Sequence, residues 1–169
     1  TSGSTGKPVF IYIDRLAAVK SLFAFIRVLK AYGGNWRKSK SCLIIDVEPG
    51  SAENAFFSES LMPFAKKFIP MDHIRYIHLG EKPEKIMNEL AEFQPEFLAS
   101  DPNMLRQLAY LKINGYGKNV NPSYIGSGGS TLDEYTRKYV KNAFNTKVFD
   151  IYGTTEAGPI GFECIEGGC

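Results

Sequence analysis

Residues 148–158 (VFDIYGTTEAG) place polar side chains directly after an apolar, strand-like run. Ile151 and Tyr152 favour extended backbone, and Gly153 permits a sharp turn just before two threonines and Glu156. In an open α/β sheet, ligands bind in the crevice outside the carboxyl ends of parallel strands. Hydroxyl groups and a carboxylate in that position could bind a nucleotide and a hard metal ion. A strand followed by an ordinary polar turn is the alternative interpretation.

Residues 1–8 (TSGSTGKP) form a second segment with suitable chemistry, and they lead into an apolar run at 9–13. Glycines allow backbone N–H groups to approach a phosphate closely, hydroxyl groups add hydrogen bonds, and Lys7 adds a positive charge. The segment is not a Walker loop, because only two residues separate Gly3 from Gly6 and because Pro8 follows the lysine. A flexible linker rich in Gly, Ser and Thr is the alternative.

The two motifs, in this order, resemble those of the adenylate-forming superfamily of acyl- and aryl-CoA ligases. Lys7 before the proline, and the residues FEC at 162–164, are most similar to the phenylacetate-CoA ligase branch and its relatives. Those relatives include deazaflavin-adenylating synthetases, capsule-biosynthesis homologues and the acyl-protein synthetases of bioluminescent bacteria. In much of the wider superfamily a lysine follows the proline, whereas Val9 stands here, so the role of that lysine is not carried over.

Position by position, the resemblance implies a triphosphate site, an adenine pocket and a magnesium ligand. The triphosphate site comprises Ser2, Gly3, Ser4, Thr5, Gly6 and Lys7, the adenine pocket comprises Gly128, Gly129, Ser130, Asp150, Tyr152 and Gly153, and Thr154 is a further cofactor-binding residue. The Tyr152 ring would stack on the base, Thr155 would contact the α-phosphate and Glu156 would bind Mg²⁺, which makes Thr155 and Glu156 the expected catalytic residues. The family's Gly-Gly turn usually ends in Glu, so Ser130 removes a carboxylate from the pocket.

The reaction implied is ATP-dependent activation of a small-molecule carboxylate as an acyl-adenylate, followed by transfer to CoA or another thiol. Such chemistry needs charge stabilisation at the α-phosphorus more than acid–base catalysis. Transfer to a protein, as in the bioluminescence enzymes, and a nucleotide-binding module without chemistry are the alternatives. In the family, the adenylation lysine lies in a carboxyl-terminal domain downstream of the second motif. We therefore expect residues 1–169 to be part of a longer enzyme and to be inactive without that domain.

The composition sets the outer limits of these interpretations. With 169 residues, of which 44% are hydrophobic and 13% aromatic, the chain can form one domain with a sizeable core. A net charge of +2 without a basic stripe gives no reason to expect nucleic acid as a partner. The most apolar helix candidate, residues 16–32, contains Lys20, Arg27 and Lys30, so no membrane association is expected.

The three cysteines are sparse and odd in number, which is typical of a reducing cytoplasm and not of a disulfide framework. Cys164 and Cys169 are separated by four residues, a spacing near the outer limit for zinc ligands. A structural Zn²⁺ would need two further ligands, and two ordinary thiols are the alternative.

The remaining sequence predicts strands alternating with helices. Strands are expected at 9–13, 41–47, 73–78, 97–100 and 124–129, before the strand that ends near Gly153. Helices are expected at 16–32 after Asp14, after Ser51 as far as Pro63, from Pro83 to Pro95, at 102–115 after Asp101, and from a capping box at 131–134 to residue 144. His73 and His78 would face opposite sides of one strand, and aromatic residues such as Phe23, Phe25, Phe56 and Phe57 would be core. This alternation predicts a single α/β domain, a mostly parallel sheet flanked by helices.

Overall fold

The computed structural model describes residues 14–51, 54, 63, 66–67, 70–154 and 157–164. The described helices are α1 (Arg15–Ala31), the 3₁₀ helix η2 (Met71–His73), α4 (Pro83–Phe93), α5 (Pro102–Ile113) and α6 (Glu134–Phe144). The described strands are β1 (Ser41–Ile45), β2 (Ile74–His78), β3 (Phe97–Ser100), β4 (Tyr124–Gly128), β5 (Lys147–Thr154) and β6 (Gly158–Phe162). The strand expected at 9–13 and most of the helix expected after Ser51 lie outside the described residues.

The described strands form one sheet in the order β2-β1-β3-β4-β5-β6. All neighbouring pairs are parallel except β5 and β6, which form an antiparallel hairpin. The prediction of a mostly parallel α/β sheet is therefore confirmed. The central strands are nearly continuous apolar runs because helices cover both of their faces.

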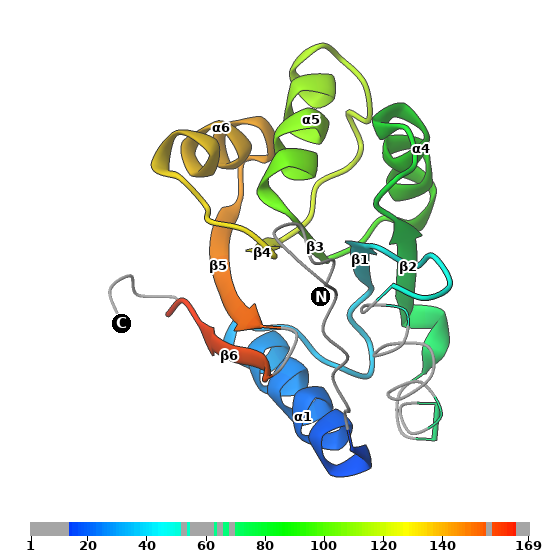
Figure 1. The fold of residues 1–169 in the computed structure, drawn as a ribbon. Helices are drawn as coiled ribbons and strands as arrows, with labels where there is room; N and C mark the ends of the chain where they lie inside the picture. The colour runs from blue at the N-terminus through cyan, green and yellow to red at the C-terminus, as the bar shows by residue number, and fades with distance from the viewer. Residues whose placement is uncertain are drawn as a thin grey trace.

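The helices lie in two layers around the sheet, with α4, α5 and α6 on one face and α1 on the other (Figure 1). Each layer buries its own apolar cluster. Leu90 and Leu108 pack with Ile125 on the side of the three helices, and Tyr32 packs with Phe149 on the side of α1. The Tyr32 and Phe149 rings are stacked with their centroids 3.9 Å apart. Both faces of the sheet are thereby shielded, so its carboxyl edge is where ligand groups would be expected.

Helix starts follow the capping residues in most cases. The side chain of Asp14 accepts a hydrogen bond from Ala17 N, and Asp101 accepts from Asn103 N and Met104 N, as the sequence predicts. The capping box expected at 131–134 is wrong, because Asp133 is the N-cap of α6 and accepts from Thr136 N. The helix consequently starts two residues later than a cap at position 131 would place it.

Three further expectations differ from the structure. Phe23 was expected in the core, but its side chain is 60% exposed on α1. Gly153 was expected to end its strand, but β5 continues to Thr154. His73 lies in η2, one residue before β2, so the two histidines do not share a strand. At the carboxyl end of β2, His78 lies 3.5 Å from the Asp46 carboxylate, in accord with a structural role.

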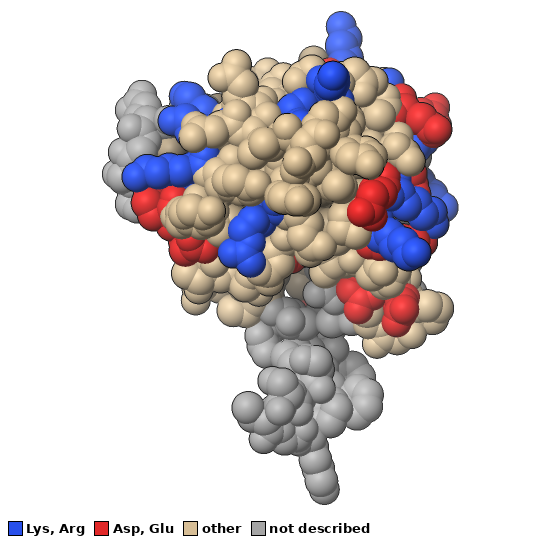
Figure 2. All heavy atoms as spheres, turned by 90° about the horizontal axis from the view of Figure 1, so that it is seen from above, with Lys and Arg blue, Asp and Glu red and all other residues tan. Residues whose placement is uncertain are grey.

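Surface charges on the face above α4, α5 and α6 are mixed. Figure 2 shows Lys and Arg interspersed with Asp and Glu around a mainly uncharged centre. Among the described residues, no helix combines the length and the apolar character needed to cross a membrane.

Candidate functional site

Two predicted parts of the adenine pocket meet at the carboxyl edge of the sheet. β4 and β5 are neighbouring parallel strands, with Ser127 opposite Asp150 and Gly128 opposite Ile151. The glycine turn after β4 therefore lies beside the end of β5, although more than twenty residues separate them in sequence. Gly129 has a φ of +85°, a left-handed conformation that a residue with a Cβ rarely adopts. The sequence predicts that both segments follow strands, and the tertiary structure makes those two strands neighbours.

Gly153 is required by close packing within a hairpin. A β-bulge lies between Tyr152 and Gly153, and a Cβ on Gly153 would come within 2.8 Å of Gly158 O. Thr154 pairs with Gly158, and the Thr154 hydroxyl accepts a hydrogen bond from Ala157 N at 3.1 Å. The turn thus follows Thr154, and the glycine allows β6 to approach β5.

Individual side chains at this edge differ in accessibility. Tyr152 is 64% exposed, so its ring is free to stack on a planar ligand. Ser130 and Thr154 are also exposed, whereas Asp150 is half-buried. Ser2, Gly3, Ser4, Thr5, Gly6 and Lys7 lie outside the described residues, as do Thr155 and Glu156. The phosphate loop and the magnesium ligand therefore stay predictions.

Sequence reasoning missed Glu163, which binds the strand that carries the adenine-pocket residues. Glu163 Oε2 accepts hydrogen bonds from Asp150 N at 2.9 Å and from Arg137 Nη1 at 2.7 Å. Partial burial alone would raise the pKa of Glu163, but these hydrogen bonds and the positive charge of Arg137 bring the pKa below its ordinary value. Glu163 is the central residue of the FEC tripeptide at 162–164, whose sequence resembles the family but does not indicate these partners.

The opposite side of the Glu163 main chain contacts α1. Tyr32 donates its phenolic hydrogen to Glu163 O at 2.7 Å. Burial, with a smaller contribution from the nearby Glu163 carboxylate, raises the pKa of Tyr32 to about 12. Glu163 therefore joins the end of the β5–β6 hairpin to α1.

The structure gives no support to a zinc site. Cys164 is a half-buried free thiol, and Cys169 lies outside the described residues. Within the described part of the chain, no group of three His, Cys, Asp or Glu side chains is placed to hold a metal ion. Two ordinary thiols remain the simpler interpretation.

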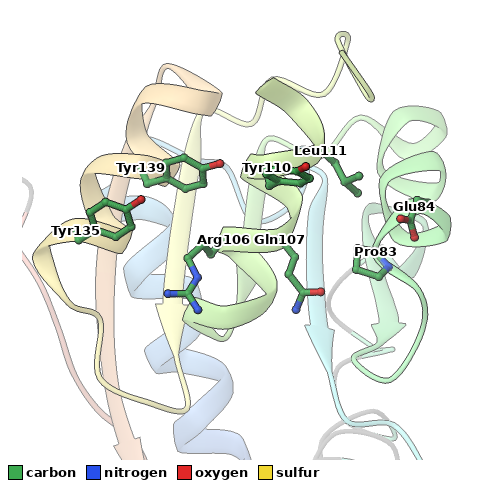
Figure 3. Close-up of a pocket in the computed structure, with 8 residues that line it drawn as sticks. All are labelled: Pro83, Glu84, Arg106, Gln107, Tyr110, Leu111, Tyr135 and Tyr139. Carbon is green, nitrogen blue, oxygen red and sulfur yellow. The ribbon is translucent and has the colours of Figure 1, made fainter. Parts of the chain in front are cut away.

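Two grooves open on the described surface. One, of about 740 Å³, lies between α1 and β6 and includes Arg27, Glu163 and Cys164 in its lining. The other, of about 390 Å³, lies over the outer helices and is lined by Tyr110, Tyr135, Tyr139 and Arg106 among others (Figure 3). Tyr135 is 69% exposed there. Neither groove contains the adenine-pocket residues.

Comparisons with known proteins agree with this architecture. No protein-family model matches the sequence. Protein CapK of Staphylococcus aureus is 25% identical over 170 residues, which cover 99% of this chain and 37% of CapK. The chain therefore spans little more than a third of that curated relative.

Solved structures of CoA ligases match most of the chain. A 2-hydroxyisobutyryl-CoA ligase, in complex with 2-HIB-AMP and CoA, has a TM-score of 0.65 and 15% identity over 92% of this chain and 36% of its own. A malonyl-CoA ligase with methylmalonyl-CoA and AMP bound has a TM-score of 0.68 and 21% identity over 96% of this chain and 33% of its own. The long-chain-fatty-acid-CoA ligase FadD1 from Archaeoglobus fulgidus has a TM-score of 0.68 and 13% identity over 98% of this chain and 33% of its own.

The chain has the fold of the corresponding third of these CoA ligases. The resemblance to adenylate-forming enzymes is thus confirmed at the level of the fold. The assignment to the phenylacetate-CoA ligase branch stays a prediction.

Proposed function

We propose that this chain supplies the ATP- and Mg²⁺-binding part of a ligase that activates a small-molecule carboxylate as an acyl-adenylate and transfers it to CoA. The observation that carries the proposal is the pairing of Gly128 with Ile151, which brings the glycine turn after β4 and the end of β5 to the same edge of the sheet. The resemblance to adenylate-forming enzymes assigns residues of both segments to an adenine pocket, and the chain has the fold of CoA ligases.

In this proposal, adenine lies between the glycine turn and the exposed ring of Tyr152. The backbone of Gly128 and Gly129 would line one side of the base, and stacking on an aromatic ring would hold the other. Ser130 offers a hydroxyl where the family usually has a carboxylate. Any hydrogen bond to the nucleotide at that position would therefore be uncharged.

The triphosphate would be bound by the segment containing Ser4, Thr5 and Lys7, with Thr155 at the α-phosphate. Glu156 suits Mg²⁺, because hard cations prefer carboxylate and phosphate oxygens. The bound ion would neutralise charge as the substrate carboxylate attacks the α-phosphorus and pyrophosphate leaves. Thr154 and Ala157, the described neighbours of these two residues, lie where β5 turns into β6 at the same edge as the adenine pocket.

Calorimetric titration with ATP, in the presence and absence of Mg²⁺, tests the nucleotide site. The Glu156→Ala variant should weaken Mg²⁺-dependent binding about tenfold, because it removes a charged metal ligand, while binding without metal changes little. Glu134→Gln on α6 is a control, since its side chain is exposed and lies outside the proposed site. Unchanged Mg²⁺-dependent binding by Glu156→Ala would show that the metal assignment is wrong.

The chemical step needs a separate measurement, made on the complete ligase that this proposal implies. Carboxylate-dependent exchange of labelled pyrophosphate into ATP would support adenylation, whereas ATP binding without exchange would favour a non-catalytic module. A labelled acyl group recovered on CoA supports the proposed acceptor. Label recovered on a polypeptide would instead favour an acyl-protein synthetase.

A further inference from the structure

A single carboxylate outside the predicted motifs joins β5 to α6. Glu163 follows β6 directly, and its Oε2 accepts hydrogen bonds from the Asp150 amide and from Arg137 on α6. In return, Glu163 N donates to Asp150 O at 3.0 Å. Both main-chain polar groups of Asp150 are therefore bound by the same residue.

The side chain of Glu163 replaces a main-chain acceptor in the β5–β6 ladder. In a hydrogen-bonded antiparallel pair, two residues normally exchange two N–H to C=O bonds. Here the Glu163 carboxylate takes the Asp150 amide, and the Glu163 carbonyl instead accepts from the Tyr32 hydroxyl on α1. The end of the hairpin is thereby held to the helical layers on both faces of the sheet.

The ion pair with Arg137 is withdrawn from solvent. The side chains of Arg137 and Glu163 are 24% and 31% exposed, and Arg137 Nη1 also donates to Val148 O at 2.8 Å. The arginine thus binds β5 directly as well as through the carboxylate. A pair held by several such hydrogen bonds is more rigid than an exposed surface salt bridge.

The register of the β5–β6 hairpin depends on its open end, where Asp150 lies beside Glu163. The ladder between β5 and β6 is interrupted by the bulge between Tyr152 and Gly153, so the regular pairing before the bulge sets the register of the two strands. That pairing consists of Tyr152 with Gly161, Ile151 with Phe162, and the hydrogen bonds between Asp150 and Glu163. Movement of Asp150 would be transmitted within two residues to the exposed ring of Tyr152.

We propose that Glu163, anchored by Arg137, is a positioning residue that fixes Asp150 and Tyr152 for binding of the nucleotide base. The inference rests on the proposed function, because the base is expected to be the adenine of ATP. It assigns to Glu163 no contact with substrate and no part in the chemistry. Substitution of Glu163 should therefore weaken binding of the base and leave binding of the phosphates unchanged.

The test compares two ligands that share phosphates and differ in the base. Wild type and Glu163→Gln are titrated by calorimetry with Mg²⁺·ATP and with Mg²⁺·inorganic triphosphate. Glutamine keeps the size of the side chain but removes the charge that binds Arg137. We expect the Kd for ATP to rise about five- to tenfold and the Kd for triphosphate to stay within about twofold.

Glu134→Gln is the matched control, because the Glu134 carboxylate lies 3.8 Å from Arg137 Nε and is 68% exposed. It should leave both dissociation constants unchanged. Partial unfolding of a variant lowers the stoichiometry of both titrations alike, whereas misplacement of the base pocket changes the ratio of the two constants. Arg137→Gln provides a second variant and should change that ratio in the same direction.

If Glu163→Gln lost equal affinity for ATP and for triphosphate, or lost affinity for neither, the positioning role would be overturned. The proposed function would still stand. Wild-type protein that binds neither ligand would overturn the proposed function and this inference with it. If Glu134→Gln bound ATP as weakly as Glu163→Gln does, the effect would come from the general charge around Arg137. That result would also overturn the positioning role.

Discussion

Substitution of Gly153 by alanine should destabilise the hairpin that carries the candidate site. The added Cβ would lie 2.8 Å from Gly158 O and 3.3 Å from Pro159 Cα. These are main-chain atoms of the neighbouring strand, so no side-chain rotation relieves the contact. Either β6 moves away from β5, which weakens their hydrogen bonds, or the bulge changes its conformation.

The expected size of the effect combines two opposing terms. Overpacking in a closely packed region costs about 1–3 kcal/mol. Replacing glycine by alanine also restricts the unfolded chain, which stabilises the protein by about 0.4–1 kcal/mol where the backbone conformation is permitted. The free energy of unfolding should therefore fall by about 1–2 kcal/mol in Gly153→Ala.

Gly161→Ala is the matched control, because Gly161 lies in the same hairpin and an added Cβ would meet no atom within 4 Å. This variant should be neutral or more stable by up to about 1 kcal/mol. Urea unfolding can be followed by the fluorescence of the single tryptophan, Trp36, which packs against the core cluster beneath α1. Equal midpoints for the two variants, with equal m-values, would refute the reasoning.

Two further predictions concern the supports of the fold. Lys112→Met should lower the free energy of unfolding by about 2 kcal/mol, because Lys112 Nζ donates to Val120 O at 2.5 Å and to Asn121 Oδ1 at 3.1 Å in the loop before β4. Urea titration checks this prediction, with Lys118→Met, which removes an exposed lysine from the same loop, as the control. Equal losses of unfolding free energy in the two variants would contradict the prediction. The pKa of Glu163 in the folded protein lies below its ordinary value of 4.5, so its stabilising contribution is full well above pH 4.5 and disappears as the pH falls through the folded-state pKa. The stability difference between wild type and Glu163→Gln should accordingly shrink between about pH 7 and about pH 3, and a difference independent of pH would contradict the role of the charge.

Local signals predicted most of the described elements. Asp14 and Asp101 accept hydrogen bonds from the first turn of their helices because capping involves residues only two or three positions apart. The apolar run at 97–100 became β3, and the helix expected from Pro83 became α4 (Pro83–Phe93). These features depend on near neighbours in the chain, which the sequence displays directly.

Errors occurred where a local pattern had two equally good outcomes. Residues 131–134 match a capping box, yet Asp133 also has the chemistry of an N-cap and is the one used. Tyr135 falls on the same helical face as Val140 by spacing, but its side chain is exposed. Spacing identifies a direction around a helix, and only the neighbouring element decides how wide the buried face is.

The sequence by itself determined the alternation of strands and helices, the order of the two motifs and the side chains available to bind nucleotide and metal. The tertiary structure decided that β4 lies beside β5, that β6 returns antiparallel, and that Glu163 occupies the end of the β5–β6 ladder with Arg137 and Tyr32 as partners. Strand order and long-range pairing arise from the competition of many apolar surfaces for burial across the whole chain. No local pattern around Glu163 specifies that Arg137, 26 residues earlier in the chain, will become its partner.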